Sequence, residues 1–141
     1  MQPEKHPLSN RSRFERFLLD LTAAIREHGG ASAGLADYRL LSPDDEWLFP
    51  KYPGRTVILP PEADLLDGLQ RFIVDNEAQL CEVDCRLGAW VHPHTGEVYL
   101  DVTTSCADLA EARRVALEVG ARDGRRVVAL YNALRKETVY L

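Results

Sequence analysis

The segment LGAWVHPHTGEVYLDV, residues 87–102, constrains the fold more than any other part of the chain. In its second half, Val98, Leu100 and Val102 alternate with polar or aromatic residues, a pattern typical of a strand with one buried face. The tetrapeptide PHTG, residues 93–96, places proline and glycine where a tight turn needs them. The segment therefore predicts a β-hairpin.

The turn sets which residues face each other across this hairpin. With residues 93–96 as the turn, Trp90 stands opposite Tyr99, and His92 stands opposite Glu97. One face is then aliphatic and suited to a core, with Leu87, Ala89, Val91, Val98, Leu100 and Val102. The other face is polar and aromatic, with Trp90, His92, Glu97, Tyr99 and Asp101. A shift of one residue would exchange the two faces.

Other segments show helical or strand patterns. Residues 12–28 predict an amphipathic helix that starts with a capping box at Ser12 and Glu15 and ends at Gly29. Further helices are expected at residues 61–80 and 106–120, and a short one starting at Ser42-Pro43. Strands are expected at residues 56–59, 125–131 and 137–141, and a loop of small residues at 29–37.

These elements predict an α+β fold of two layers, a mostly antiparallel sheet with helices packed on it. The 141 residues suit a single domain with a core of its own. Within it we expect a flexible segment at 1–11, a helical N-terminal part at 12–86, and a β-β-α-β-β module at 87–141.

The net charge of −5 is concentrated in the middle of the chain. Residues 37–84 hold eleven acidic residues against Arg39, Lys51, Arg55 and Arg71, a net charge of −7. This predicts a surface for a basic protein partner, with Asp44, Asp45, Glu46, Asp64 and Asp67 as its candidates. The arginines between Arg113 and Arg126 suggest an alternative, nucleic-acid binding, although acidic residues between them neutralise much of their charge.

Cysteine and histidine residues raise the question of a metal. Cys81, Cys85, His92 and His94 are four ligand types that zinc accepts, but their spacing matches no common zinc motif. We therefore expect no cofactor, and the alternative is a zinc-binding protein or a metal-dependent enzyme that uses these four residues. Three cysteines are too few for a disulfide framework, which favours the cytoplasm, and neither a membrane span nor a secretory signal is expected.

Recognised catalytic motifs are missing, so no catalytic residue is assigned and we expect a protein that is not an enzyme. The best candidate nucleophile is Cys106, because a helix expected to start there would lower the pKa of its thiol. The polar and aromatic face of the hairpin is a stronger candidate, since Trp and Tyr often anchor binding interfaces. Its alternative role is structural, as a cross-strand aromatic pair.

Residues 87–141 resemble small uncharacterised proteins of actinobacteria and of their phages or mobile elements. The resemblance rests on Gly88, Trp90, Pro93, Thr95, Gly96, Leu100, Asp101 and Val102, on the alanine-rich helix and on the final strand pair. It implies the hairpin and no particular reaction. The expected function is therefore protein binding, as an accessory, immunity-like or antitoxin-like protein, whose partner and oligomeric state the sequence does not indicate.

Overall fold

The computed structural model describes residues 7–141. Its helices are α1 (Pro7–His28), α2 (Leu65–Asp75), α3 (Glu77–Leu80) and α4 (Leu109–Asp123), with a short 3-10 helix at Pro53–Arg55. Its strands are β1 (Gly30–Gly34), β2 (Arg39–Leu40), β3 (Trp47–Pro50), β4 (Val57–Leu59), β5 (Arg86–Val91), β6 (Val98–Cys106), β7 (Ala129–Asn132) and β8 (Glu137–Tyr140).

The strands form one antiparallel sheet in the order β2-β1-β5-β6-β3-β7-β8, and β4 pairs with β6 next to β3. The expected α+β fold is confirmed. The sheet also joins the two parts of the chain, because β3 lies between β6 and β7. The β-β-α-β-β order of residues 87–141 is present, but its two strand pairs are held together by a strand from the N-terminal part.

The hairpin of β5 and β6 has the predicted register. Trp90 pairs with Tyr99, and the backbone N–H of His92 donates to Glu97 O at 2.8 Å. Gly96 closes the turn with a φ of 75° and donates to His92 O. The left-handed φ is one that glycine adopts without strain, which explains the choice of residue.

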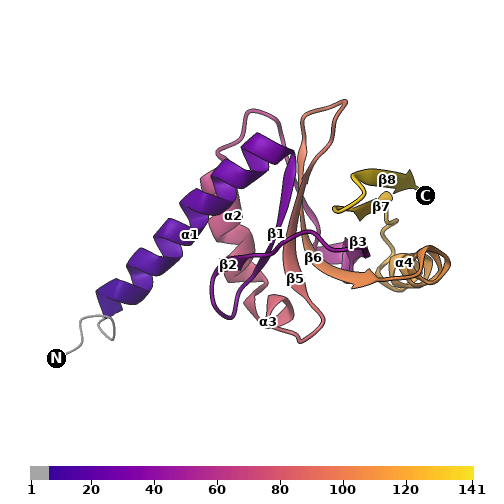
Figure 1. Ribbon diagram of the computed structural model, residues 1–141, viewed down its shortest axis with the longest axis horizontal. Coiled ribbons are helices and arrows are strands. Elements are labelled where there is room, and N and C mark those ends of the chain that lie inside the picture. Colours follow the sequence, from indigo (N-terminus) through magenta and orange to yellow (C-terminus); the bar gives the residue numbers. More distant parts are fainter. Residues whose placement is uncertain (1–6) are drawn as a thin grey trace.

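Helices cover one face of the sheet in two blocks (Figure 1). Helices α1, α2 and α3 pack on β1, β5 and β6, where Leu87, Leu100 and Val102 are fully buried. Helix α4 packs over β3 and β7 around Trp47 and Phe49, which pair with Cys106 and Thr104 on the same face of β6. The opposite face, which carries Trp90, Tyr99 and Asp101, has no helix on it.

Three expectations for the N-terminal part were wrong. Helix α1 begins at Pro7, so Ser12 lies inside it, and of the segment expected to be flexible only residues 1–6 lie outside the described residues. Residues 30–34 form β1 rather than a loop, because they pair with β5 along its length. No helix starts at Ser42: the chain continues to β3, whose Trp47 and Phe49 are buried under α4.

The helix expected at residues 106–120 is α4, but it begins at Leu109 and ends at Asp123, three residues later than predicted at each end. The Asp108 side chain accepts from the backbone N–H of Glu111, as a capping residue does. The helix passes Gly120 and ends at Gly124, whose φ of 67° is left-handed. Gly120 is needed for packing instead, because a Cβ there would lie 3.2 Å from Arg125 O. Within residues 7–141, no helix combines the length and apolar character that a membrane crossing requires.

Candidate functional site

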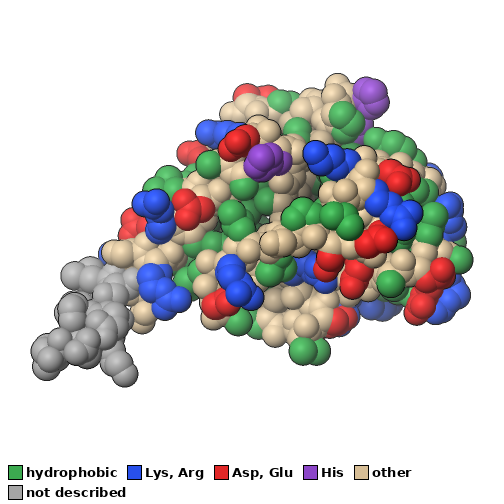
Figure 2. Space-filling model, viewed as in Figure 1, with side chains coloured by type: hydrophobic (Ala, Val, Ile, Leu, Met, Phe, Trp, Pro, Cys, Tyr) green, Lys and Arg blue, Asp and Glu red, His purple; other side chains and the backbone are tan. Residues whose placement is uncertain are grey.

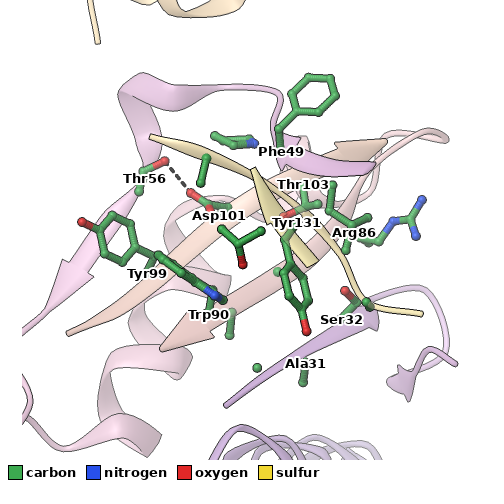
Figure 3. A pocket seen from close by; sticks show the side chains of 18 of the residues that line it. Ala31, Ser32, Phe49, Thr56, Arg86, Trp90, Tyr99, Asp101, Thr103 and Tyr131 are labelled. Carbon is green, nitrogen blue, oxygen red and sulfur yellow. Dashed lines mark hydrogen bonds between the residues drawn. The ribbon is translucent and has the colours of Figure 1, made fainter. Parts of the chain in front are cut away.

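The helix-free face of the sheet curls around a cavity of about 750 Å³. Its floor is formed by β5 and β6. Its walls come from the last turn of α1, β1, residues 40–44, β3, residues 53–58, and the chain from Arg125 through β7 to β8. The lining is mainly apolar. Figure 3 shows Trp90, Tyr99 and Asp101 on the floor and Tyr131 on the opposite wall. Three aromatic rings and one carboxyl group therefore share this space.

An aromatic cluster borders one end of the cavity. The Trp90 ring lies 5.5 Å from the Tyr99 ring across the strand pair and 5.2 Å from the His92 ring along β5. His92 lies outside the cavity lining, and its Nδ1 accepts from the backbone N–H of His94 in the turn. These tilted contacts hold the Trp90 ring at the cavity wall and are of the kind that stabilises cross-strand pairs.

Asp101 is the one acidic side chain on the floor among the residues that the structure describes. Its Oδ1 accepts from Thr56 Oγ1 at 2.5 Å. Burial raises the pKa of this carboxyl to about 6, although the Thr56 hydrogen bond and the positive charge of Arg125 act in the opposite direction. The free energy of desolvating the carboxylate is therefore larger than the stabilisation that Thr56 and Arg125 give to its charge.

Gly88 leaves the carboxyl uncovered. It pairs with Asp101 across the strands, so a side chain there would stand beside the carboxyl group. A Cβ on Gly88 would collide with Thr103 Oγ1 on the same face. The glycine is thus required by the packing of Thr103, and its missing side chain keeps Asp101 open to the cavity.

Charged side chains of both signs surround the cavity. The positive ones are Arg86, Arg125, Arg126 and Lys136, and the negative ones besides Asp101 are Glu27 and Asp44. All three arginines donate to protein oxygens: Arg86 to Ser105 Oγ at 3.0 Å, Arg125 to Thr56 O at 2.7 Å and Arg126 to Leu141 O. Figure 2 shows positive and negative side chains interspersed on the visible face of the molecule rather than a patch of one sign.

The structure brings together part of the binding surface predicted from the hairpin. Trp90, Tyr99 and Asp101 line the cavity, and His92 touches both aromatic rings, with 6.3 Å between its ring and that of Tyr99. Glu97 lies apart, in the turn, where its backbone N–H and its carboxylate both bond to Thr95 Oγ1.

The five acidic candidates do not form one surface with free carboxylates. Asp45 accepts from Arg135 at 2.8 Å and from Asn132 at 2.9 Å, and the Arg135 hydrogen bond, followed by that from Asn132, lowers its pKa. Glu46 accepts from Ser105. Asp64 caps α2, and Asp67 pairs with Arg71 on that helix at 3.1 Å. Asp44 lies at the cavity.

The four proposed zinc ligands are not brought together, and the four-ligand site is corrected on that ground. Cys85 directly precedes β5 and His92 directly follows it. A strand rises about 3.3 Å per residue, so the six residues of β5 separate the two side chains by roughly 20 Å. No single ion can bind both ends of the strand. Cys81 is exposed near the Cys85 end, and His94 lies in the turn at the other.

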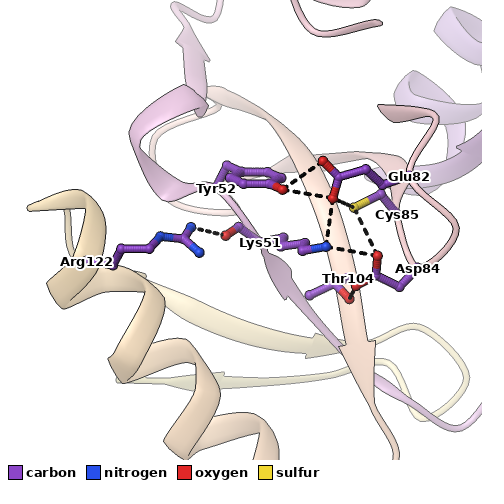
Figure 4. Close-up of polar contacts among 7 residues, drawn as sticks. All are labelled: Lys51, Tyr52, Glu82, Asp84, Cys85, Thr104 and Arg122. Carbon is purple, nitrogen blue, oxygen red and sulfur yellow. Dashed lines mark hydrogen bonds and ion pairs between the residues drawn. The ribbon is translucent and has the colours of Figure 1, made fainter. Parts of the chain in front are cut away.

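Cys85 instead joins an ion cluster on the helix-covered side (Figure 4). Lys51 Nζ lies 2.7 Å from Glu82 Oε1 and 2.9 Å from Asp84 Oδ1, and the Tyr52 hydroxyl also donates to Glu82. Burial, followed by the charge of Asp84, raises the pKa of the Cys85 thiol to about 11. Glu82, Asp84 and Cys85 lie close enough to share a metal cation, but both carboxylates already form ion pairs with the Lys51 ammonium.

Cys106 does not have the setting of a nucleophile. It is the last residue of β6 rather than the first of a helix, and its pKa is raised by burial and then by the charge of Glu111.

The arginines between Arg113 and Arg126 do not form one free basic patch. Arg114 pairs with Glu118 and Arg122 with Asp123, whereas Arg125 and Arg126 line the cavity.

Several cavity residues were not named as site candidates from the sequence: Ser32, Thr56, Arg86, Thr103 and Tyr131, and Gly88 was named only for the resemblance. The alternation of β6 was a usable signal for Thr103, which points the same way as Tyr99 and Asp101. No local signal links Tyr131 or Thr56 to the hairpin, since both reach it only through tertiary structure.

The chain was compared with protein families, curated proteins and solved structures. It matches no family model, no curated protein and no solved structure. The candidate site is therefore argued from its own geometry.

Proposed function

We propose that this protein is a non-enzymatic binding protein and that its ligand occupies the cavity on the helix-free face of the sheet. The observation that carries the proposal is the cavity itself. Its volume of about 750 Å³ lies in the range of small-molecule sites. Its mainly apolar lining, with aromatic rings and a few polar groups, is also the composition that such sites have.

The residues around Asp101 support binding rather than catalysis. Covalent catalysis needs a nucleophile within hydrogen-bond reach of a base. The Thr56 hydroxyl is within reach of the Asp101 carboxyl, but such a pair also needs a third group that orients the base, and no other described side chain donates to this carboxyl. Among the described lining residues there is no cysteine, and the only histidine is His28, at the end of α1. Carboxyls with a raised pKa cluster at functional sites, and recognition of a ligand is the use that we assign to Asp101.

A second candidate is a protein partner, in line with an accessory or immunity-like role in the cytoplasm. It is favoured by Trp90 and Tyr99, which are residue types that dominate binding energy at interfaces and which are partly exposed on this face. The acidic segment supports it less, because four of its five candidate carboxylates already bind within the fold. A partner would therefore meet the cavity face.

The two tryptophans allow a direct test. Trp90 lies at the cavity, and Trp47 is buried under α4. A fragment library is screened by NMR with the two indole N–H signals as reporters. We expect fragments that move the Trp90 signal and leave the Trp47 signal in place.

A blocking variant controls this screen. Ser32→Phe places a ring in the cavity from β1, and it should abolish the shifts while the protein stays folded. Fragments that bind Ser32→Phe as well as wild type, or no fragment that moves the Trp90 signal, would contradict a ligand site here. For the partner, recovery from native lysate is compared between wild type and Trp90→Ala, and equal recovery of every protein would remove the role of this face.

A further inference from the structure

Asp101 offers one carboxylate oxygen that the fold does not use. Thr56 donates to Oδ1, and no other donor among the described residues reaches the carboxyl. The missing side chain of Gly88 leaves this group facing the cavity. A carboxylate in apolar surroundings is costly unless it is paired and hydrogen-bonded. The second carboxylate oxygen of Asp101 is therefore available to a positively charged group of a ligand.

Arg125, the cation that acts on the Asp101 charge, does not bind this oxygen. Arg125 acts on the Asp101 charge from a distance, while its Nη1 donates to Thr56 O at 2.7 Å instead of to the carboxylate. Thr56 is thus held by both residues, with its hydroxyl on Asp101 and its carbonyl on Arg125. This arrangement keeps the guanidinium beside the carboxylate without forming an ion pair with it.

The aromatic residues suit a positive group at the same place. Trp90 and Tyr99 lie on the floor beside Asp101, and Tyr131 faces them from β7 (Figure 3). Ring faces attract cations, most strongly for tryptophan and most of all where water is excluded. A carboxylate combined with several rings is the donor set that binds organic ammonium and guanidinium groups, and the apolar lining accommodates the rest of such a molecule.

We propose that the ligand of this cavity carries an ammonium or guanidinium group, which pairs with the free Asp101 oxygen and contacts the Trp90, Tyr99 and Tyr131 rings. This rests on the proposed function, that the cavity is the ligand site. The positive charge can belong to a free small amine or to a lysine or arginine side chain of a partner. The opposing consideration is the set of cations around the cavity, Arg86, Arg125, Arg126 and Lys136, which an anionic ligand would use.

Three indoles that differ in charge decide between these possibilities. Tryptamine is cationic, tryptophol is neutral and indole-3-acetate is anionic at neutral pH. Their affinities are measured by NMR titration against wild type, Asp101→Asn and the control Asp75→Asn, which removes an exposed carboxylate of α2 outside the cavity lining. We expect tryptamine to bind wild type most tightly and to lose at least about tenfold in Asp101→Asn, because a desolvated charge pair is lost.

The controls separate the two proposals. Tryptophol should change less than about twofold in Asp101→Asn, and Asp75→Asn should bind tryptamine within about twofold of wild type, as expected of an exposed charge outside the cavity. If indole-3-acetate binds best and Asp101→Asn does not weaken tryptamine, the cavity remains a ligand site but the cationic ligand is wrong. If none of the three moves the Trp90 signal although library fragments do, the cationic ligand is wrong and the ligand site remains. If no library fragment moves it either, the proposed function fails as well.

Two further probes distinguish the sources of the charge. N-acetyl-lysine amide and N-acetyl-arginine amide carry the side chains that a protein partner would offer. Binding of either one with the same loss in Asp101→Asn supports a partner side chain, and binding of tryptamine alone supports a free amine. Because Asn retains an oxygen that can accept from Thr56, Asp101→Asn should fold normally, which thermal unfolding checks.

Discussion

The two faces of the β5–β6 pair are built from alternate residues of the same two strands, and they differ in almost every property. On the covered face, Leu87, Leu100 and Val102 are fully buried under α1 and α2. On the open face, Trp90, Tyr99 and Asp101 are only partly buried and border a cavity. Neighbouring positions along one strand thus have different roles. Residues of the covered face stabilise the fold, and residues of the open face form a candidate site.

The difference shows where the fold tolerates an unfavourable group. A core position that held a carboxyl without a charged partner would be strongly destabilising. On the open face, Asp101 keeps one hydrogen bond and contact with the cavity, so its charge costs less and is retained. If this comparison is right, substitutions on the two faces should differ in both size and sign of their effect on stability.

The largest effect is expected on the covered face. Leu100→Ala removes a fully buried side chain from the core between β6 and the helices, and it should lower the free energy of unfolding by about 2–5 kcal/mol. Urea unfolding measures the difference. The matched control is Leu117→Ala on α4, where the leucine is 61% exposed and the change should stay within about 0.5 kcal/mol. Similar losses in both variants would mean that the covered face is not the main core.

The next effect is expected on the open face, with the opposite sign. The pKa of Asp101 is about 6 in the folded protein against an ordinary value of 3.8, so the folded state holds this proton more tightly. Its contribution to stability is therefore greatest below pH 4 and is lost as the pH rises to about 6. Asp101→Asn should be more stable than wild type at pH 7, by up to about 3 kcal/mol, and similar to it near pH 3.

Thermal and urea unfolding over this pH range measure the effect, and Asp75→Asn, at an exposed carboxylate of α2, is the control. A variant that is less stable than wild type at pH 7 would show that the Asp101 charge stabilises the fold, and the contrast between the faces would then be lost.

The alternation that separates the faces could be predicted, because a hairpin is a local structure. The pattern of Val98, Leu100 and Val102 together with the PHTG turn sets the register without any distant contact. The open face was likewise predicted from Trp90, Tyr99 and Asp101. The second wall of the cavity could not be predicted, because Tyr131 lies there only as a result of the pairing of β3 between β6 and β7.

The wrong expectations have the same origin. Residues 30–34 are small and have no hydrophobic alternation, so nothing local marks β1, which exists because β5 offers it an edge. The Ser42-Pro43 helix signal is sound in isolation. It is overridden because Trp47 and Phe49 gain more by packing under α4 as a strand than a short helix would provide.

A smaller effect is expected for the aromatic part of the open face. Trp90→Ala removes the ring contacts with Tyr99 and His92 and some buried area, and it should cost about 1–2 kcal/mol, less than Leu100→Ala. Loss of ligand binding should be the larger consequence. Trp90→Phe retains a ring and should recover most of the stability. A loss as large as that of Leu100→Ala would place Trp90 in the core and remove the distinction between the faces.

The smallest effect on stability is expected at Lys51, in the ion cluster on the covered side of the sheet. Lys51 lies between the two helical blocks, bound to Glu82 and Asp84, and its backbone carbonyl accepts from Arg122 of α4 at 2.6 Å (Figure 4). Both carboxylates remain partly exposed, so Lys51→Met should cost less than about 1 kcal/mol at low salt and still less at high salt.

The pH dependence of this variant should oppose that of Asp101→Asn. Lys51 lowers the pKa of Glu82 and Asp84, so its contribution is present above their ordinary pKa and is lost as the pH falls. Wild type and Lys51→Met should therefore converge in stability towards pH 3, where urea unfolding is repeated. A difference that persists in acid would mean that the methylene chain of Lys51, rather than its charge, holds the two helical blocks together, and polar and apolar parts of the covered face would then stabilise it by the same means.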